Sequence, residues 1–350
     1  MPRRVIAGDL PAPMLALAKP EMPRDEGWSF EPKWDGFRAI VAAGGEGGAR
    51  VVSRDGRPLG RYFPEIVALV TERPAARFVA DGEIVRIDGG RMAFDELQLR
   101  LHPAESRVRK LAGEIPATLI LFDLLEDDGG SLLDRPLAER RARLAALGER
   151  LGVPVAADRL DEMPPGPAMF LAPWTDDPAT AARWFADEGG LGEDGVVAKR
   201  PEQPYLPGER GWVKVKHRRS ADCVVGGYRV AKNDDGVGSL LLGLYDGDVL
   251  HYVGHTSSFR AEERRLLRET LAPLEGGVSF EDGRAPGGQS RWSGGRDTEW
   301  VSLEPSVVCE VSFDRLQGGR FRHAATFVRW RPERDPRSCT FEQLMPPASG

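Results

Sequence analysis

A lysine that leads into a tight turn carries the clearest chemical signal in the chain. Lys33 precedes the pair Asp35-Gly36 and an apolar run, and Arg38 follows five residues after the lysine. Lysine side chains can act as covalent nucleophiles or bind phosphate groups. The motif also fits an ordinary hairpin with a surface lysine, because Asp-Gly pairs recur along the chain. Other motifs must therefore decide between the two interpretations.

Carboxylates and a lysine pair follow further along the chain. Glu83 comes after a short apolar run, and Asp194 opens an Asp-Gly pair before another such run. Lys214 and Lys216 lie two apart in a segment typical of a strand, so we expect both on one face of it. Taken singly, these segments fit turns and a strand with lysines on one side.

Short apolar runs separated by turns predict an α+β first half with a mostly antiparallel sheet. The runs are rich in Val, Ile and Phe and are bounded by Asp-Gly or Gly-Gly pairs, as strands often are. We expect strands at 37–42, 51–53, 78–80, 84–87 and 118–125, and helices at 137–151 and 178–188. The segment Asp81-Gly82-Glu83 then falls in a turn. The order of elements is not a βαβ repeat, so no dinucleotide-binding fold is expected.

The second half has the pattern of a small barrel. We expect five short strands, at 223–230, 239–245, 249–253, 307–313 and 326–330. One amphipathic helix is expected between the third and fourth strands, at 261–271. This pattern suits a closed OB fold, although other small barrels share it. We expect the domain boundary near residue 219, which gives domains over 1–218 and 219–350.

Composition limits the class of protein. The 350 residues are 41% hydrophobic and 29% charged, enough for a core and for about two domains. No run approaches the roughly 18 apolar residues of a membrane span, so a cytoplasmic protein without membrane contact is expected. The three cysteines are far apart and lack Cys-x-x-Cys spacing, which favours buried thiols over a disulfide framework or a zinc site.

The net charge of −6 hides two basic segments. Residues 199–232 contain nine cations and three anions, and residues 315–334 contain six arginines and one anion. A solvated surface explains such segments as well as a nucleic-acid contact does.

The ordered set of motifs resembles the covalent nucleotidyltransferases, and most of all the ATP-dependent DNA ligases of the bacterial ligase C type and the ligase domain of ligase D. The motifs that carry the resemblance, in chain order, are Lys33-Trp34-Asp35-Gly36-Phe37-Arg38, Ser53-Arg54-Asp55-Gly56, Asp81-Gly82-Glu83, Phe122-Asp123, Glu193-Asp194-Gly195, Trp212-Val213-Lys214-Val215-Lys216 and Arg329-Trp330-Arg331-Pro332-Glu333-Arg334. The resemblance covers nearly the whole chain. It implies an ATP-grasp-like nucleotidyltransferase domain of α+β class, followed by an OB-fold domain.

The resemblance also implies an activity and its residues. Such enzymes seal nicks in duplex DNA through a lysyl-AMP and a DNA-adenylate. The catalytic residues implied are Lys33, Arg38, Lys214 and Lys216, with Glu83 and Asp194 for Mg²⁺ or Mn²⁺. The ATP contacts implied are Glu31, Lys33, Arg38, Arg54, Glu83, Phe122, Lys199, Arg210, Lys214, Lys216, Arg331 and Arg334. Among them, Glu31 is expected to bind the adenine amine. Surrounding cations are expected to lower the pKa of Lys33.

Partners and location follow from the same resemblance. We expect a monomer that acts on nicked double-stranded DNA, associates with the nucleoid, and works in repair with other repair or end-joining proteins. The chain departs from the family pattern at two places. Asp194 has a shorter side chain than the usual glutamate, so Glu193 competes with it for the role of metal-binding carboxylate. Glu333 and Arg334 replace the usual Asp and Lys of the C-terminal motif.

Two alternatives remain at this stage. One is an RNA ligase or capping-type enzyme of the same superfamily, which a competition between ATP and GTP would distinguish. The other is a non-catalytic nucleic-acid-binding protein with an OB fold, which would be expected to have lost Lys33 or the lysine pair.

Overall fold

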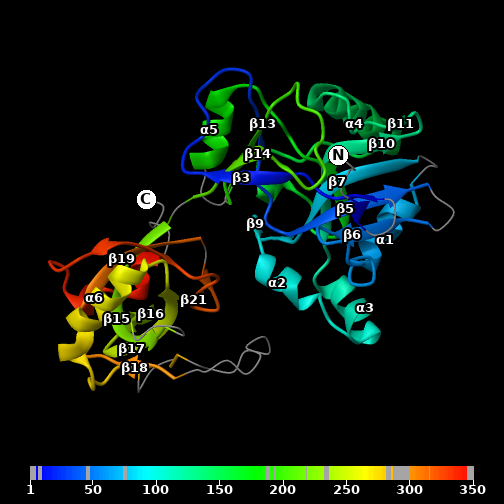
Figure 1. Cartoon of the computed structure of the whole chain (residues 1–350). Coiled ribbons are helices and arrows are strands. Elements are labelled where there is room, and N and C mark those ends of the chain that lie inside the picture. The colour runs from blue at the N-terminus through cyan, green and yellow to red at the C-terminus, as the bar shows by residue number, and fades with distance from the viewer. Residues whose placement is uncertain are drawn as a thin grey trace. The chain divides into compact units, whose positions relative to one another are not determined.

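The computed structural model describes residues 5–6, 10–44, 48–73, 77–186, 190–192, 194–217, 219–231, 236–280, 285–286, 299–314 and 316–344. The chain forms two compact units, Met1–His217 and Arg218–Gly350, which are described separately (Figure 1). None of the helices in the described ranges is long and apolar enough to cross a lipid bilayer.

The larger sheet of the first unit is antiparallel except for one strand. Its strands run in the order β11-β10-β7-β5-β6, with β12 parallel to β10. Their bounds are β5 (Phe37–Ala43), β6 (Arg50–Ser53), β7 (Phe78–Val85), β10 (Thr118–Asp127), β11 (Gly130–Ser131) and β12 (Ala168–Leu171). The expected α+β class with a mostly antiparallel sheet is confirmed.

The expected turn at Asp81-Gly82-Glu83 is wrong. All three residues lie inside β7, which runs unbroken from Phe78 to Val85. Gly82 is needed there for close approach of strands, since a Cβ atom on it would lie 2.5 Å from the carbonyl oxygen of Ile120. An Asp-Gly pair therefore marks tight strand packing at this position and does not mark a turn.

Helices pack around this sheet. They are α1 (Pro64–Thr71), α2 (Phe94–Leu99), α3 (Glu105–Glu114), α4 (Leu137–Leu151) and α5 (Pro178–Ala186), with a short 3₁₀ turn η1 (Leu160–Glu162). The apolar side of α4 is buried against β10, through Leu144 and Leu147 among others. The helix ends at Gly152, whose left-handed backbone (φ 63°) is the usual conformation of a residue that closes a helix.

A second sheet of four strands completes the first unit. Its order is β3-β14-β13-β4, with β3 parallel to β14 and the other neighbours antiparallel. The bounds are β3 (Leu15–Lys19), β4 (Ser29–Pro32), β13 (Val196–Lys199) and β14 (Arg210–Val215). Two small pairs, β1 (Val5–Ile6) with β2 (Leu10–Pro11) and β8 (Ile87–Asp88) with β9 (Arg91–Met92), lie outside both sheets.

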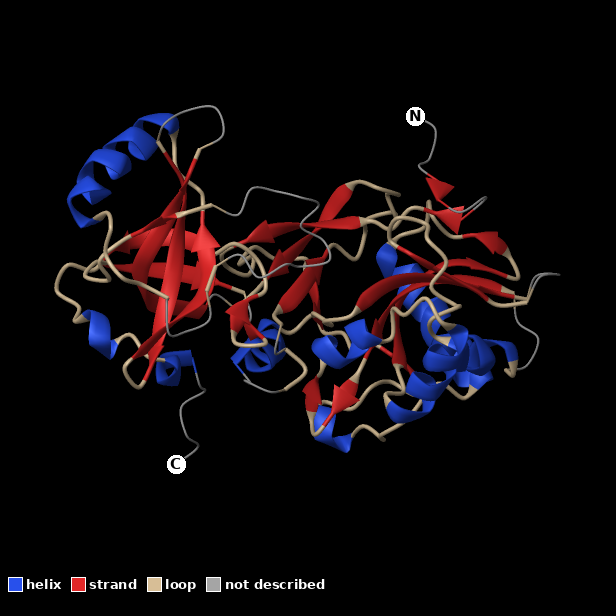
Figure 2. Ribbon diagram, turned by 90° about the horizontal axis from the view of Figure 1, so that it is seen from below, coloured by secondary structure: helices blue, strands red, loops and turns tan. Residues whose placement is uncertain are grey.

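The second unit is a barrel. Five strands run in the order β17-β16-β15-β19-β22, and a bridge between Thr256 and Ala325 joins the two ends of this order. Figure 2 shows the strands of both units in red and the helices in blue. The bounds are β15 (Arg219–Val230), β16 (Val237–Asp246), β17 (Val249–Thr256), β18 (Val301–Ser302), β19 (Val308–Phe313), β20 (Leu316–Gln317), β21 (Arg320–Phe321), β22 (Thr326–Trp330), α6 (Ala261–Leu271), η2 (Ala272–Leu274), η3 (Pro336–Ser338) and η4 (Phe341–Leu344). The expected strands and helix are present; β15, β16 and β17 are longer than expected by three or four residues, and β19 is shorter by one.

The barrel core confirms the expectation for the cysteines. Cys223, Cys309 and Cys339 are all free and buried in one apolar cluster. Burial raises the pKa of the Cys223 thiol well above its ordinary value. A buried, protonated thiol is a poor nucleophile, so these residues serve packing.

Candidate active site

A cavity of about 300 Å³ in the first unit gathers most of the residues that the sequence indicates. Its lining contains five cations and two acids: Lys33, Arg38, Arg54, Arg210 and Lys214, with Glu31 and Glu83. Trp34, Phe122 and Trp212 add aromatic surface. A wall with such an excess of positive charge suits a polyanionic ligand with a flat base.

The register of the smaller sheet explains why its residues meet here. Val197 of β13 is paired with Glu31 of β4 on one side and with Lys214 of β14 on the other. Paired residues share a face of a sheet, so these three form one row on the side of the cavity. The row unites positions that are more than 180 residues apart in the sequence.

Lys33 follows β4 directly and is fixed through its backbone. Its N–H donates to the carbonyl of Gly195 at 2.9 Å. Gly195 has a φ of 118°, and a Cβ atom on it would lie 2.0 Å from the carbonyl oxygen of Val215, so only glycine fits this turn. The side-chain amine of Lys33 donates to Asp194 Oδ2 and, at 3.4 Å, to the carbonyl of Trp34.

The expectation that neighbouring cations lower the pKa of Lys33 is wrong for this structure. Burial does lower that pKa, but the charge and hydrogen bond of Asp194, together with Asp35 and Glu83, outweigh burial and raise it. The carboxylates lie closer to the amine than the sequence pattern suggested. The lysine is therefore held in its charged form here.

The lysine pair divides between two environments. Lys214 lines the cavity, and burial together with Lys33 and Lys216 lowers its pKa. Lys216 lies one residue beyond the end of β14, and its Nζ is 3.7 Å from Asp194 Oδ2. Asp194 thus contacts both Lys33 and Lys216. Glu193, the competitor for its role, lies outside the described residues.

Glu83 points to the same cavity from β7. Burial raises the pKa of its carboxyl to about 7, although Arg38 and Lys33 oppose the shift. The described residues include no group of three or more metal-ligating side chains. Two carboxylates still suit Mg²⁺, which is usually bound by one or two carboxylates together with substrate phosphates and water.

Arg38 is engaged by the protein rather than left open. It forms two hydrogen bonds to Asp81 (2.5 and 2.7 Å) and a third to the carbonyl of Met14 (3.2 Å). Its guanidinium lies 4.6 Å from the ring centroid of Phe122. Asp81 is fully buried, so it fixes Arg38, which lines the cavity, from within the protein.

Known proteins match the chain over both units. Residues 13–216 match the family model "ATP dependent DNA ligase domain", and residues 233–334 match "ATP dependent DNA ligase C terminal region". DNA ligase C1 of Mycolicibacterium smegmatis is 44% identical over 347 residues, which span 96% of this chain and 94% of that protein. DNA ligase C of Mycobacterium tuberculosis is 45% identical over 351 residues, with the same coverage.

The chain belongs to the ATP-dependent DNA ligases. The resemblance stated from the motifs is confirmed, and the fold class with it. A solved structure of a Lig E DNA ligase superposes with a TM-score of 0.53 at 17% identity, covering 91% of this chain and 99% of that one, which supports the fold alone. The family match favours a DNA ligase over an RNA ligase, a capping enzyme or a non-catalytic binding protein.

The remaining predicted residues of the ligase take different places. Arg54 and Arg210 line the cavity and are exposed. Lys199 is buried outside the lining, where its Nζ lies 2.5 Å from Glu31 Oε1 and 3.9 Å from the ring centroid of Trp212. The carboxylate of Glu31 is thus already paired. Burial raises the pKa of Glu31 and lowers that of Lys199, and the charge of each partner opposes the shift of the other.

Arg331 and Arg334 belong to the second unit of the ligase. Both follow β22, and both lie beside Asp222, with Arg331 Nη1 at 3.0 Å from Oδ1 and Arg334 Nε at 3.4 Å from Oδ2. Their predicted contact with ATP stays a prediction.

Several buried residues that support the ligase site are not among the site residues predicted from the motifs. Asp81 belongs to a motif but is expected only in a turn, and no role is predicted for Tyr205. The hydroxyl of Tyr205 donates to Asp81 and accepts the N–H of Met14 at 2.8 Å. Arg140, fully buried, pairs with Asp123 at 2.8 Å through both oxygens. Charged residues inside otherwise apolar segments were the available signal, since such residues are rarely buried without a partner.

Tyr205→Phe should destabilise the ligase. The change leaves the buried Met14 N–H without its partner and removes one of the two hydrogen bonds to Asp81 Oδ2, which keeps its bond from Arg38. An unsatisfied buried donor costs about 1–3 kcal/mol in the free energy of unfolding. Tyr62→Phe is the matched control, because the Tyr62 hydroxyl makes no hydrogen bond within the described part of the chain. Urea titration of both variants tests the difference. Equal unfolding free energies for the two would contradict it.

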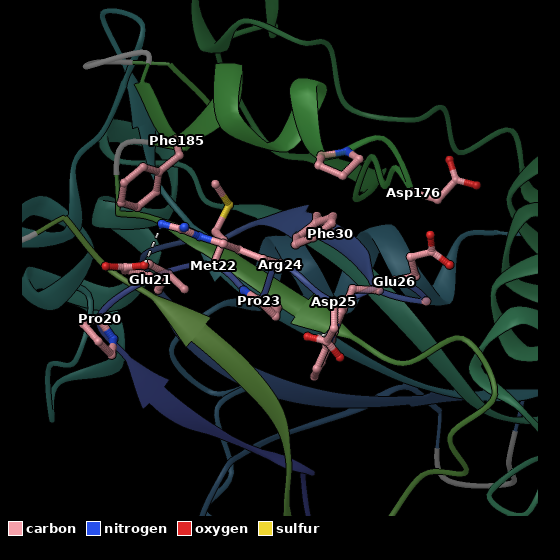
Figure 3. A pocket seen from close by; sticks show the side chains of 14 residues that line it. Pro20, Glu21, Met22, Pro23, Arg24, Asp25, Glu26, Phe30, Asp176 and Phe185 are labelled. Carbon is pink, nitrogen blue, oxygen red and sulfur yellow. Dashed lines mark hydrogen bonds and ion pairs between the residues drawn. The ribbon is translucent and has the colours of Figure 1, made fainter.

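A second cavity, of about 660 Å³, lies on the opposite face of the four-stranded sheet. Phe30 and Val215 line it, whereas their chain neighbours Glu31 and Lys214 line the first cavity. In Figure 3 the Phe30, Met22 and Phe185 side chains surround it, and Arg24 is bonded to Glu21. The larger cavity is mainly apolar and its arginine is paired. Charge, not size, therefore distinguishes the candidate site of the ligase from this cavity.

Proposed function

We propose that this ligase seals nicks between a 5′-phosphate and a 3′-hydroxyl in duplex DNA, with Lys33 as the residue that becomes adenylated. The observation that supports this proposal is the position of Lys33 in a cavity with four further cations and two carboxylates. A triphosphate needs that charge compensation, and nucleotidyl transfer depends on it more than on covalent chemistry.

In the first step, Lys33 Nζ attacks the α-phosphorus of ATP. A P–N bond forms, the P–O bond to pyrophosphate breaks, and lysyl-AMP results. Attack needs the neutral amine, so the contact with Asp194 that keeps Lys33 charged must loosen when ATP is bound. The cations Lys214 and Lys216 beside the amine then favour its neutral form.

In the second and third steps, the nucleotide passes to DNA and leaves. The 5′-phosphate at the nick attacks the AMP phosphorus, and Lys33 departs as an amine. The 3′-hydroxyl then attacks the DNA-adenylate, a phosphodiester forms, and AMP leaves. A lysine suits this sequence because its phosphoramidate is labile enough to pass AMP onward.

Glu83 and Asp194 would hold a Mg²⁺ or Mn²⁺ ion beside the phosphates. The ion would supply positive charge against the charge that develops on the phosphate oxygens. The raised pKa of Glu83 supports this role, because a carboxyl that is costly to ionise in the free protein gains from a nearby cation.

The other residues of the cavity orient the nucleotide. Glu31 is placed to accept from the adenine amine, and Lys199 holds its carboxylate in position. Phe122 offers an apolar face for the base, and Arg54 and Arg210 offer planar donors for phosphate. Arg38 supports the wall through Asp81. Arg331 and Arg334 would bind the β- and γ-phosphates that leave as pyrophosphate.

The basic segments 199–232 and 315–334 are the proposed contacts to the DNA backbone. Most of their cations lie within the described residues, except Arg218, Lys232 and Arg315. A backbone contact carries no sequence preference, which suits an enzyme that must act at any nick. We extend the proposal to a role in DNA repair at the nucleoid, as a monomer with other repair or end-joining proteins.

Incubation with α-labelled ATP and Mg²⁺ or Mn²⁺, followed by a chase with nicked duplex DNA, tests the function. We expect a labelled protein band that disappears on the chase while sealed strand appears. A parallel incubation with α-labelled GTP should give no band. Absence of a labelled band from ATP with either metal would contradict the proposal, and preferential labelling from GTP would indicate a capping-type enzyme.

A further inference from the structure

Two acidic residues of the barrel lie beside the arginines that follow β22. Asp222 on β15 and Glu310 on β19 are paired across the sheet, and they are only 12% and 18% exposed. Arg331 Nη1 donates to Asp222 at 3.0 Å and to Glu310 at 3.4 Å. Arg334 Nε lies 3.4 Å from the second oxygen of Asp222. Asp222 therefore contacts both arginines.

The backbone of Asp222 is fixed independently of these arginines. Its N–H donates to Gln343 Oε1 at 2.9 Å, and its carbonyl accepts from Gln343 Nε2 at 3.0 Å. Gln343 lies in η4, and its Nε2 also donates to the carbonyl of Thr340. The C-terminal turn thus clamps the strand from which the Asp222 carboxylate projects.

The other acids near the arginines are less suited to hold both. Glu310 is shared with Arg329, whose Nε donates to it at 2.7 Å. Glu333 contacts Arg331 Nε alone and is 59% exposed. The backbone of Arg331 is also fixed, because its N–H donates to the carbonyl of Val308 at 2.9 Å. Asp222 is the acid that sets the relative position of the two side chains.

We propose that Asp222 is a positioning residue for the first step of the reaction, which acts by holding Arg331 and Arg334 ready for the phosphates of ATP. The proposal rests on the proposed function of these two arginines. Long arginine side chains lose rotamer freedom when they bind a ligand, and a side chain that is already held loses less. Arg331 keeps its Nη2 without a partner among the described residues, and that nitrogen remains available for phosphate.

Asp222→Asn tests the proposal, since it removes the charge and keeps the shape and the backbone clamp. We expect the KM for ATP in lysyl-AMP formation to rise about tenfold. A rise of this size corresponds to the loss of one charge-assisted hydrogen bond. Sealing of nicked DNA that already carries AMP involves no pyrophosphate and should change less than about twofold. Asp222→Glu restores the charge and should recover part of the loss.

Controls separate this proposal from the proposed function. Asp248→Asn removes an exposed ion pair with Arg337 in the same unit and should leave both steps unchanged. If Asp222→Asn forms lysyl-AMP as the wild type does while Arg331→Ala loses lysyl-AMP formation, the positioning role is overturned and the proposed function stays intact. Normal adenylation by Arg331→Ala would overturn the phosphate role of Arg331 and with it the positioning role of Asp222, whereas nick sealing through Lys33 would stand. Equal loss in both steps with a lower melting temperature would show that Asp222 serves only the fold.

Discussion

Lys33→Ala protein is expected to carry no label after incubation with α-labelled ATP. The amine is the one lysine that both lines the cavity and directly follows β4, where the Gly195 carbonyl fixes its backbone. Without it, the amine proposed to form the P–N bond is gone, so nick sealing from ATP is expected to be lost as well. The measurement is autoradiography of the denatured protein, because a covalent adduct survives denaturation.

The control for this experiment is a lysine with no place in the site. Lys110 on α3 is 62% exposed and lies near Glu114 of the same helix, so Lys110→Ala should label as the wild type does. Circular dichroism shows whether Lys33→Ala remains folded, since the change also removes the partner of Asp194. A labelled band from Lys33→Ala would mean that another residue is adenylated.

The second large effect is expected from Asp123→Ala. Asp123 and Arg140 are almost wholly buried, and they join β10 to α4 through two hydrogen bonds of 2.8 Å. Arg140 also donates to the carbonyls of Arg135 and Gln203. Loss of the carboxylate leaves a buried guanidinium without its counter-charge, which lowers the free energy of unfolding by about 3–5 kcal/mol.

An exposed pair gives the comparison for Asp123→Ala. Arg159 and Asp161 are 62% and 52% exposed, although they also form two hydrogen bonds. Asp161→Ala should therefore lower the free energy of unfolding far less than Asp123→Ala does. Urea unfolding followed by tryptophan fluorescence measures both variants. If the two lose equal stability, the buried pair does not hold the first unit together as its contacts indicate.

Local patterns predicted part of the fold, whereas the helices α1, α2 and α3 and the strands β3, β4 and β12 were not expected. The helices at 137–151 and 261–271 and the strand at 326–330 have the bounds expected from periodicity. Their signals lie within a few residues of each other, so nothing distant is needed to interpret them. The Asp-Gly pair at 81–82 misled because its role depends on Ile120, a residue of another strand.

The partners of the charged side chains could not be predicted in the same way. Lys33 and Asp194 are separated by 161 positions, and Arg38 and Asp81 by 43. The resemblance brought these residues into one site but did not give their contacts in the ligand-free protein. For that reason the pKa of Lys33 shifts in the direction opposite to the one expected, and Arg38 supports the wall from within a buried pair.

The smaller sheet of the first unit limits where residues can be inserted into or deleted from the chain. Strands β4 and β14 present alternate residues to the nucleotide cavity and to the apolar cavity behind it. Removal of one residue from either strand would exchange the two faces, because side chains alternate with a period of two. Phe30 would then stand among the cations, and the carboxylate of Glu31 would face Met22 and Phe185. We expect these strands to accept single substitutions but no insertion or deletion, so that engineered length changes belong in the loops beyond them.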